Sequence, residues 1–192
     1  MKKGKIIFIM WISWAWKWTL VNNLLKEKSD FKFALSCKTR PKRDFEVDWV
    51  DAHFLTEQDF KTRIEAWEFL EYAHVHKGWY YWTLLKDVLD EWIYTWINVI
   101  SEVEIAWLKE ILKNRNDLKE DIISIFLDIP DEEIERRLRK RWESLSDSYL
   151  ENRLSSAKVE RENLDFYDYV IDSHKNNEKE VLEIVLDIVK NK

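Results

Sequence analysis

The residues whose types and spacing most directly suggest chemistry lie near the start of the chain. They are Trp11, Ile12, Ser13, Trp14, Ala15, Trp16, Lys17, Trp18 and Thr19. With glycine written at Trp11 and Trp16, the spacing becomes G-x-x-x-x-G-K, followed one place late by Thr19. In that pattern, backbone N–H groups and a helix N-terminus cradle phosphates, and the lysine reaches the β- and γ-phosphates. The segment therefore predicts a phosphate-binding loop in which Lys17 supplies the charge.

Glycine is scarce in this chain, and tryptophan is abundant. The sequence has 2 glycines and 12 tryptophans, whereas average usage of roughly 7% predicts about 13 glycines. Trp67, Trp92 and Trp142 each directly follow a predicted helix, where glycine is the usual residue. Trp49 lies in a predicted turn. We hypothesise that all the tryptophans except Trp79 occupy glycine positions, and we call the chain with glycine at those eleven sites the glycine form.

Two origins would account for such a pattern. One is a UGA codon read as tryptophan in a gene whose host reads it as glycine, and the other is deliberate replacement. UGG codons at the eleven sites would exclude the first. An alternative interpretation is that Trp11, Trp14 and Trp18, at i, i+3 and i+7, form one apolar helical face. That interpretation leaves the helix-end tryptophans and the missing glycines unexplained.

The elements that must position the loop alternate along the chain. Apolar runs predict strands over 5–10, 31–36, 69–75, 97–103, 122–129 and 169–171. Helical spacing and capping residues predict helices over 20–28, 56–66, 84–91, about 104–113, 131–141, 149–162 and 179–190. This alternation predicts a three-layer α/β fold, with helices on both faces of a central, mainly parallel sheet.

Composition narrows the class of protein further. The 192 residues suit one domain with small insertions, and the net charge of −6 comes without a basic block, so we expect no nucleic-acid partner. Cys37 is the only cysteine, which favours a reducing cytoplasm over a disulfide framework. The apolar run over 6–16 is too short to span a bilayer and lacks a cleavage site, so we expect no membrane association.

With glycine at the eleven positions, residues 4–190 resemble guanylate kinase, a P-loop nucleoside monophosphate kinase, along essentially the whole chain. The first segment becomes GISGAGKGT, a form common in bacterial members of that family. The resemblance implies that the nine residues from Trp11 to Thr19 bind ATP. It also implies a small GMP-binding insertion over about 37–95 and a helical lid over about 142–157, set on a core of residues 1–36 and 96–192.

A second segment resembles the family motif S-x-T-T-R-x-P-R-x-G-E-V-D-G-V-D and runs from Ser36 to Asp51. The resemblance implies that Ser36, Arg40 and Arg43 bind the phosphate of GMP, a task for which paired guanidinium groups are suited. Two departures from the family pattern matter for phosphate binding. Lys38 replaces the first threonine, and Ala52 replaces the phosphate-binding tyrosine that follows the motif.

Two further segments resemble the family's guanine-binding motifs. Residues 69–73 and 80–83 are similar to F-L-E-W/Y-A and Y-Y-G-T/S, which implies that Glu71 and Thr83 bind guanine and that Tyr81 binds phosphate. A carboxylate suits the two adjacent donors of guanine. Residues 101–107 resemble L-E-I-D/E-x-Q-G, which implies that Glu104 assists guanine recognition and Glu102 holds water around Mg²⁺.

The last segments, 136–142 and 152–157, resemble the lid motifs R-L-x-x-R-G and R-L-x-x-A. The resemblance implies that Arg137, Arg141 and Arg153 act on the transferred phosphoryl group together with Lys17. Arg137 and Arg141 are spaced to share one helical face. The expected reaction is ATP + GMP giving ADP + GDP, with ATP and Mg²⁺ as cofactors.

Two questions stay open in the sequence: which residue binds Mg²⁺, and whether the protein is catalytically active. Thr19 is the nearest candidate for a protein ligand of Mg²⁺, and we expect no other metal site, because His74 and His76 alternate on one strand without further ligands. The alternative function is a catalytically inactive guanylate-kinase-like binding module. We expect the chain with tryptophan in its loop to bind ATP poorly and to fold badly, since indoles would occupy the phosphate space.

Overall fold

The computed structural model of the protein describes residues 3–11, 17–27, 30–44, 46–66, 68–75, 79–84, 93–103, 105–141, 145–174 and 177–192. Within those ranges, side chains are described except at 11, 17, 18, 70–75, 79–84, 93 and 141. The chain forms two compact units, Met1–Ile6 with Asp30–Ile122 and Ile7–Ser29 with Ile123–Lys192. Within the described residues, no helix has both the length and the apolar character needed to cross a membrane.

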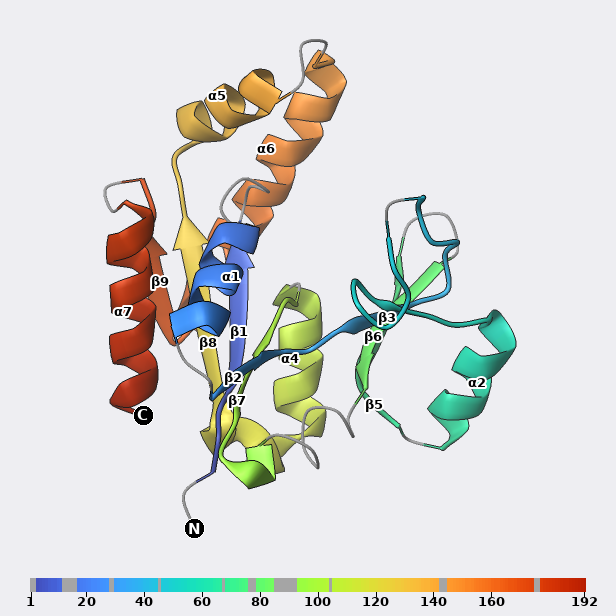
Figure 1. Ribbon diagram of the computed structural model, residues 1–192. Coiled ribbons are helices and arrows are strands. Elements are labelled where there is room, and N and C mark those ends of the chain that lie inside the picture. The colour runs from blue at the N-terminus through green and yellow to red at the C-terminus, as the bar shows by residue number, and fades with distance from the viewer. Residues whose placement is uncertain are drawn as a thin grey trace. The chain divides into compact units, whose positions relative to one another are not determined.

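The first unit contains β2 (Phe31–Phe33), β3 (Ser36–Lys38), β4 (His53–Phe54), α2 (Glu57–Glu65), β5 (Phe69–Val75), β6 (Trp79–Leu84), η1 (Ile93–Thr95), β7 (Asn98–Ser101), α4 (Ile105–Asn114) and η2 (Asn116–Asp121). The second contains β1 (Ile6–Trp11) and β8 (Ile122–Asp128), apart from their first residues, then α1 (Lys17–Glu27), α5 (Asp131–Arg141), α6 (Asp147–Arg161), η3 (Leu164–Phe166), β9 (Tyr169–Asp172) and α7 (Glu178–Lys190). Figure 1 labels these elements where there is room.

Five strands form the larger sheet, in the order β2-β7-β1-β8-β9. The outer pairs, β2 with β7 and β8 with β9, are parallel. Residues 6–10 of β1 and 122–127 of β8 are buried, as continuous apolar runs predict for strands covered on both faces. The predicted α/β fold is therefore confirmed, and the strands expected over 5–10 and 122–129 are found within one residue at each end.

The smaller sheet, in the order β4-β3-β6-β5, differs from what the sequence predicts. The strand expected over 31–36 ends at Phe33, and Ser36 instead begins β3 in the second sheet. β6 pairs antiparallel with both β3 and β5, and no strand is predicted there. The apolar run over 31–36 is continuous, so the sequence does not mark the point where the chain leaves the parallel sheet.

Capping side chains set the starts of several helices. Thr56 accepts from the Asp59 N–H at the start of α2, and Ser146 accepts from the Tyr149 N–H at the start of α6. Asn177 and Glu180 form a reciprocal capping box at α7, which satisfies backbone donors that a helix N-terminus leaves without intrahelical partners. Every predicted helix is found within three residues at each end, save the one over 84–91, since Leu84 ends β6 and 85–91 lie outside the described residues.

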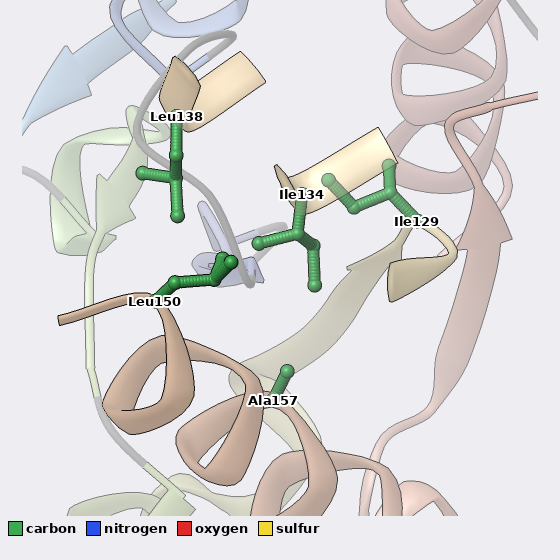
Figure 2. Close-up of a cluster of buried hydrophobic side chains, with 5 residues drawn as sticks. All are labelled: Ile129, Ile134, Leu138, Leu150 and Ala157. Carbon is green, nitrogen blue, oxygen red and sulfur yellow. The ribbon is translucent and has the colours of Figure 1, made fainter. Parts of the chain in front are cut away.

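An apolar cluster joins α5 and α6 in the second unit. Its buried members are Ile129, Ile134, Leu138, Leu150 and Ala157 (Figure 2). The members from α5 are four residues apart, so both lie on one helical face, and that face packs against α6. This packing fixes the face of α5 that carries polar groups.

Gly4 lies where no side chain fits. A Cβ at this position would stand 2.0 Å from the Ile97 carbonyl oxygen and 2.5 Å from its carbonyl carbon. Both groups are backbone, which cannot swing aside as a flexible side chain would. We therefore expect Gly4→Ala to lower the free energy of unfolding by about 1 to 3 kcal/mol, since overpacking outweighs the loss of chain entropy in the unfolded state.

Denaturant unfolding measures this change. Val159→Ala is the control, because Val159 is 53% exposed and should cost less than about 0.5 kcal/mol. Equal midpoints for Gly4→Ala and the unchanged protein would contradict the close approach at Ile97.

Candidate functional site

One face of the smaller sheet collects four of the residues expected to bind substrate. Ser36 pairs across β3 and β6 with Thr83, and Thr83 pairs across β6 and β5 with Glu71. Tyr81 lies two residues before Thr83 on β6. Paired residues and residues two apart on a strand share a face, so register places all four positions on the same face. Segments far apart in sequence are thereby brought to one surface.

Arg40 lies in the loop after β3 and is held by a buried carboxylate. Its side chain, in a residue only 6% exposed, donates from Nη1 to Glu46 Oε2 over 2.7 Å and from Nη2 to Glu46 Oε1 over 2.5 Å. Nη1 also donates to the Pro41 carbonyl oxygen. The two-pronged geometry fixes the plane of the guanidinium as well as its position.

Glu46 also organises the loop that it closes. Its Oε2 accepts from the Arg43 N–H over 2.7 Å, and its carbonyl oxygen accepts from Lys42 Nζ over 3.2 Å. The Arg40 hydrogen bonds, against the cost of burial, lower the pKa of Glu46 from its ordinary value of 4.5 to about 2. Glu46 is therefore an anion at any pH near neutrality, and it holds Arg40 and the backbone of exposed Arg43 in one arrangement.

The turn after Glu46 is tied by two aspartates. Asp51 Oδ2 accepts from the Val47 N–H over 2.7 Å, and Asp48 Oδ1 accepts from the Phe54 N–H over 2.9 Å. Trp49, within this predicted turn, has a positive φ of 63° and donates its N–H to the Ala52 carbonyl oxygen. Ala52 is fully buried, so its methyl group contributes packing but no hydrogen bond.

The expected phosphate-binding loop lies between β1 and α1. β1 ends at Trp11 and α1 begins at Lys17, so the strand–loop–helix context that the motif requires is present. Residues 12–16 lie outside the described residues, as do the side chains of Trp11, Lys17 and Trp18. Thr19 is half-buried in the first turn of α1.

The predicted lid arginines come from α5 and α6. Arg137 donates from Nε to Glu133 Oε1 over 2.6 Å, and its side chain is only 9% exposed. Arg153 donates from Nη2 to the Tyr149 hydroxyl over 2.9 Å. The apolar cluster in Figure 2 packs α5 against α6, so the helices that carry Arg137 and Arg153 are held together. Arg141 ends α5, and its side chain lies outside the description.

Of the two glutamates expected near guanine and Mg²⁺, only Glu102 lies within the described residues. Glu102 follows β7 and is exposed, and Glu104 lies outside the described residues. Across the described part of the chain, no three histidine, cysteine, aspartate or glutamate side chains are grouped as metal ligands.

Comparison with known proteins decides the family. The guanylate kinase family model matches residues 3–191. The chain belongs to the guanylate kinase family. A guanylate kinase from Thermotoga maritima is 31% identical over 190 residues, which cover 98% of this chain and 87% of that protein. One from Prochlorococcus marinus subsp. pastoris is 34% identical over 184 residues, covering 94% and 96% of the two.

A solved structure shares the fold. The crystal structure of guanylate kinase from Anaplasma phagocytophilum has a TM-score of 0.74 to this chain, with 22% identity over 99% of this chain and 86% of that one. The sequence-based assignment to the guanylate kinase family and the α/β fold are thus both confirmed.

Sequence reasoning gave no role to the residues that hold the arginines. In the sequence Glu46 is one residue of a guanylate kinase motif, and the motifs do not include Glu133 or Tyr149. Glu133 and Tyr149 stand four residues before Arg137 and Arg153, a helical spacing that brings side chains together. That spacing was the available signal. The partnership of Glu46 with Arg40 crosses an irregular loop and has no such signature.

The Glu46 pair predicts a pH-dependent stability. Its pKa in the folded protein lies below its ordinary value, so the stabilisation is complete above about pH 4.5 and is lost as pH falls towards 2. Glu46→Gln should lower the free energy of unfolding at pH 7 by about 3 kcal/mol, because it leaves Arg40 buried without its counter-ion. The difference between variant and parent should shrink at pH 3.

Urea unfolding at the two pH values tests this. Glu135→Gln is the matched control, since Glu135 pairs with Arg139 at the surface, where side chains are 43% and 51% exposed, and should cost less than about 1 kcal/mol. A loss of stability that is the same for Glu46→Gln at pH 7 and pH 3 would refute the ionic role.

Proposed function

We propose that the protein is a guanylate kinase that transfers the γ-phosphoryl group of ATP to GMP, giving ADP and GDP. The observation that carries this proposal is the shared face of Ser36, Glu71, Tyr81 and Thr83, four positions that the family's GMP motifs identify independently. An inactive binding module would need the same GMP face but not the lid arginines. Arg137, with its side chain oriented by Glu133, therefore favours the enzyme.

GMP binding would use that face together with the loop after β3. The Glu71 carboxylate accepts from the guanine N1–H and amino group, with Glu104 assisting, and the Thr83 hydroxyl contacts the guanine carbonyl. Ser36, Arg40, Arg43 and Tyr81 hold the phosphate. Adenine presents no such pair of adjacent donors, so the carboxylate selects guanine. We assign this role to the insertion over about 37–95.

ATP would bind at the loop from Trp11 to Thr19, with Lys17 on its β- and γ-phosphates. Magnesium, which typically accompanies ATP in this family, neutralises phosphate charge. Hydroxyl and carboxylate oxygens are the donors that Mg²⁺ prefers, and Thr19 and Glu102 offer one of each, Glu102 through water. No basic block suggests nucleic acid, and a lone cysteine suits a cytoplasmic setting.

The transfer step asks mainly for positioning and charge. A phosphate oxygen of GMP attacks the γ-phosphorus in line, a new P–O bond forms, and the bond to the ADP oxygen breaks. Lys17, Arg137, Arg141 and Arg153 balance the negative charge spread over the transferred group. Closure of a lid over about 142–157 would exclude water and limit ATP hydrolysis.

The active chain, in this proposal, is the glycine form. Among the described residues, the only non-glycine residues with positive φ are Trp49, at 63°, and Trp96, at 72°. Both are tryptophans, and both indoles are more than half exposed. A left-handed backbone costs an L-residue with a bulky side chain about 1 to 2 kcal/mol and costs glycine nothing. The backbone at both sites therefore supports glycine as the natural residue.

Activity tests the proposal directly. The glycine form, given ATP, Mg²⁺ and GMP, should produce ADP and GDP, and AMP in place of GMP should be a poor substrate. Lys17→Ala in the glycine form should lower kcat at least about 100-fold, since it removes charge from the transferring phosphates. A glycine form that folds but leaves GMP unphosphorylated would refute the enzyme assignment.

Stability tests the glycine assignment without activity. Trp49→Gly should raise the free energy of unfolding by about 1 kcal/mol, because the left-handed residue no longer carries a Cβ. Val50→Gly is the matched control, since Val50 is 64% exposed beside Trp49 at 63%, yet has no positive φ. There glycine should destabilise by about 0.5 to 1 kcal/mol.

The sign of the two changes is the decisive measurement. Destabilisation by both substitutions, measured by urea unfolding, would count against glycine at position 49. UGG codons at the eleven positions would exclude codon reassignment as the cause.

A further inference from the structure

We propose that Lys38 is a further ligand of the GMP phosphate and replaces a contact that the tyrosine at position 52 makes elsewhere in the family. The inference rests on the proposed function and extends it to two positions, 38 and 52, where this chain departs from the family motif. Neither change alone would be informative, but Lys38 lies in β3 and Ala52 directly precedes β4, the strand that pairs with β3.

Register places Lys38 on the substrate face. It lies two residues after Ser36 on β3 and pairs across to Tyr81 on β6. Residues two apart on a strand point to the same side, so Lys38 shares the side that carries Ser36, Tyr81 and Thr83. Of these, Ser36 and Tyr81 already have expected phosphate contacts, and Lys38 lies two residues from the first and pairs with the second.

The neighbouring strand links Lys38 to Arg40. On its other side Lys38 pairs with Phe54 of β4, and the Arg40 guanidinium carbon lies 5.4 Å from the centroid of the Phe54 ring. Lys38 therefore pairs with the residue whose ring the Arg40 guanidinium approaches. A lysine with a flexible stem can follow a phosphate held by Arg40, because its ammonium is a compact charge with rotatable donors.

Electrostatics point the same way. Burial and, next, the positive charge of Arg40 lower the pKa of the Lys38 ammonium, and Arg43 adds to the effect. Repulsion among three cations is relieved when a phosphate dianion enters. Glu46 and Asp51 oppose this shift, but Glu46 is already held by Arg40 and the Arg43 N–H.

Position 52 carries no hydrogen-bond donor on its side chain in this chain. Ala52 is fully buried beside Asp48 in an isolated bridge and directly precedes β4. Its methyl group cannot donate to phosphate. A chain that lost the tyrosine hydroxyl would lose one donor from the phosphate site. A lysine on the adjacent strand restores a donor and adds a full positive charge.

The test compares GMP with guanosine, which lacks the phosphate. In the glycine form, Lys38→Met and Lys38→Thr should each raise the KM for GMP about 10-fold, the loss expected for one charge-assisted hydrogen bond. The KM for ATP should change less than about twofold, and inhibition by guanosine should stay the same. Adding Ala52→Tyr to Lys38→Thr, which recreates the family pair, should recover most of the loss.

Controls make each outcome decisive. Lys61→Met removes the same charge from α2, where Lys61 pairs with Glu57 and is 57% exposed, and should leave the KM for GMP unchanged. An unchanged KM for GMP in Lys38→Met, or equal weakening of GMP and guanosine, would overturn the proposal. If the glycine form itself failed to phosphorylate GMP, the proposed function would fail before Lys38 is tested.

Discussion

Arg40, which we expect to bind phosphate, is held in one orientation by the carboxylate of Glu46. Burying Arg40 costs solvation free energy that only a paired anion offsets. Both oxygens of Glu46 face Arg40, and one also accepts from the Arg43 N–H. The ion pair thus sets the orientation of one cation and the backbone of the loop that carries another.

The same device recurs in the second unit. Arg137 is held by Glu133, and Arg153 by the Tyr149 hydroxyl, each from one helical turn earlier. Glu133 serves two arginines, since Arg136 donates to it as well, and these bonds bring its pKa down to about 2. Cations oriented in advance stabilise transferring charge without reorganisation during the reaction. A neighbour on the same helix provides this orientation without relying on distant parts of the chain.

Local patterns account for what the sequence predicts well. A few neighbouring residues are enough to predict α5 from its first acids, α2 from its Thr56 cap and β8 from its apolar run. The split between β2 and β3 is not local. Ser36 pairs with Thr83 in a strand more than forty residues away, and only that pairing separates it from Phe33. The order of the motifs predicts the site residues, whereas the partner of Arg40 depends on how a loop closes.

The tryptophans fit the same distinction between local and distant causes. At position 49 the turn is made by backbone and carboxylate bonds, since Asp48 and Asp51 tie residues 47 to 54 whatever side chain stands between them. The left-handed φ is a demand of that turn and not of the indole. The indole gains an edge contact with His53, with ring centroids 4.2 Å apart, yet most of it remains in solvent. A turn that fixes φ through its neighbours favours the one residue without a Cβ, so tryptophan there opposes the structure that surrounds it.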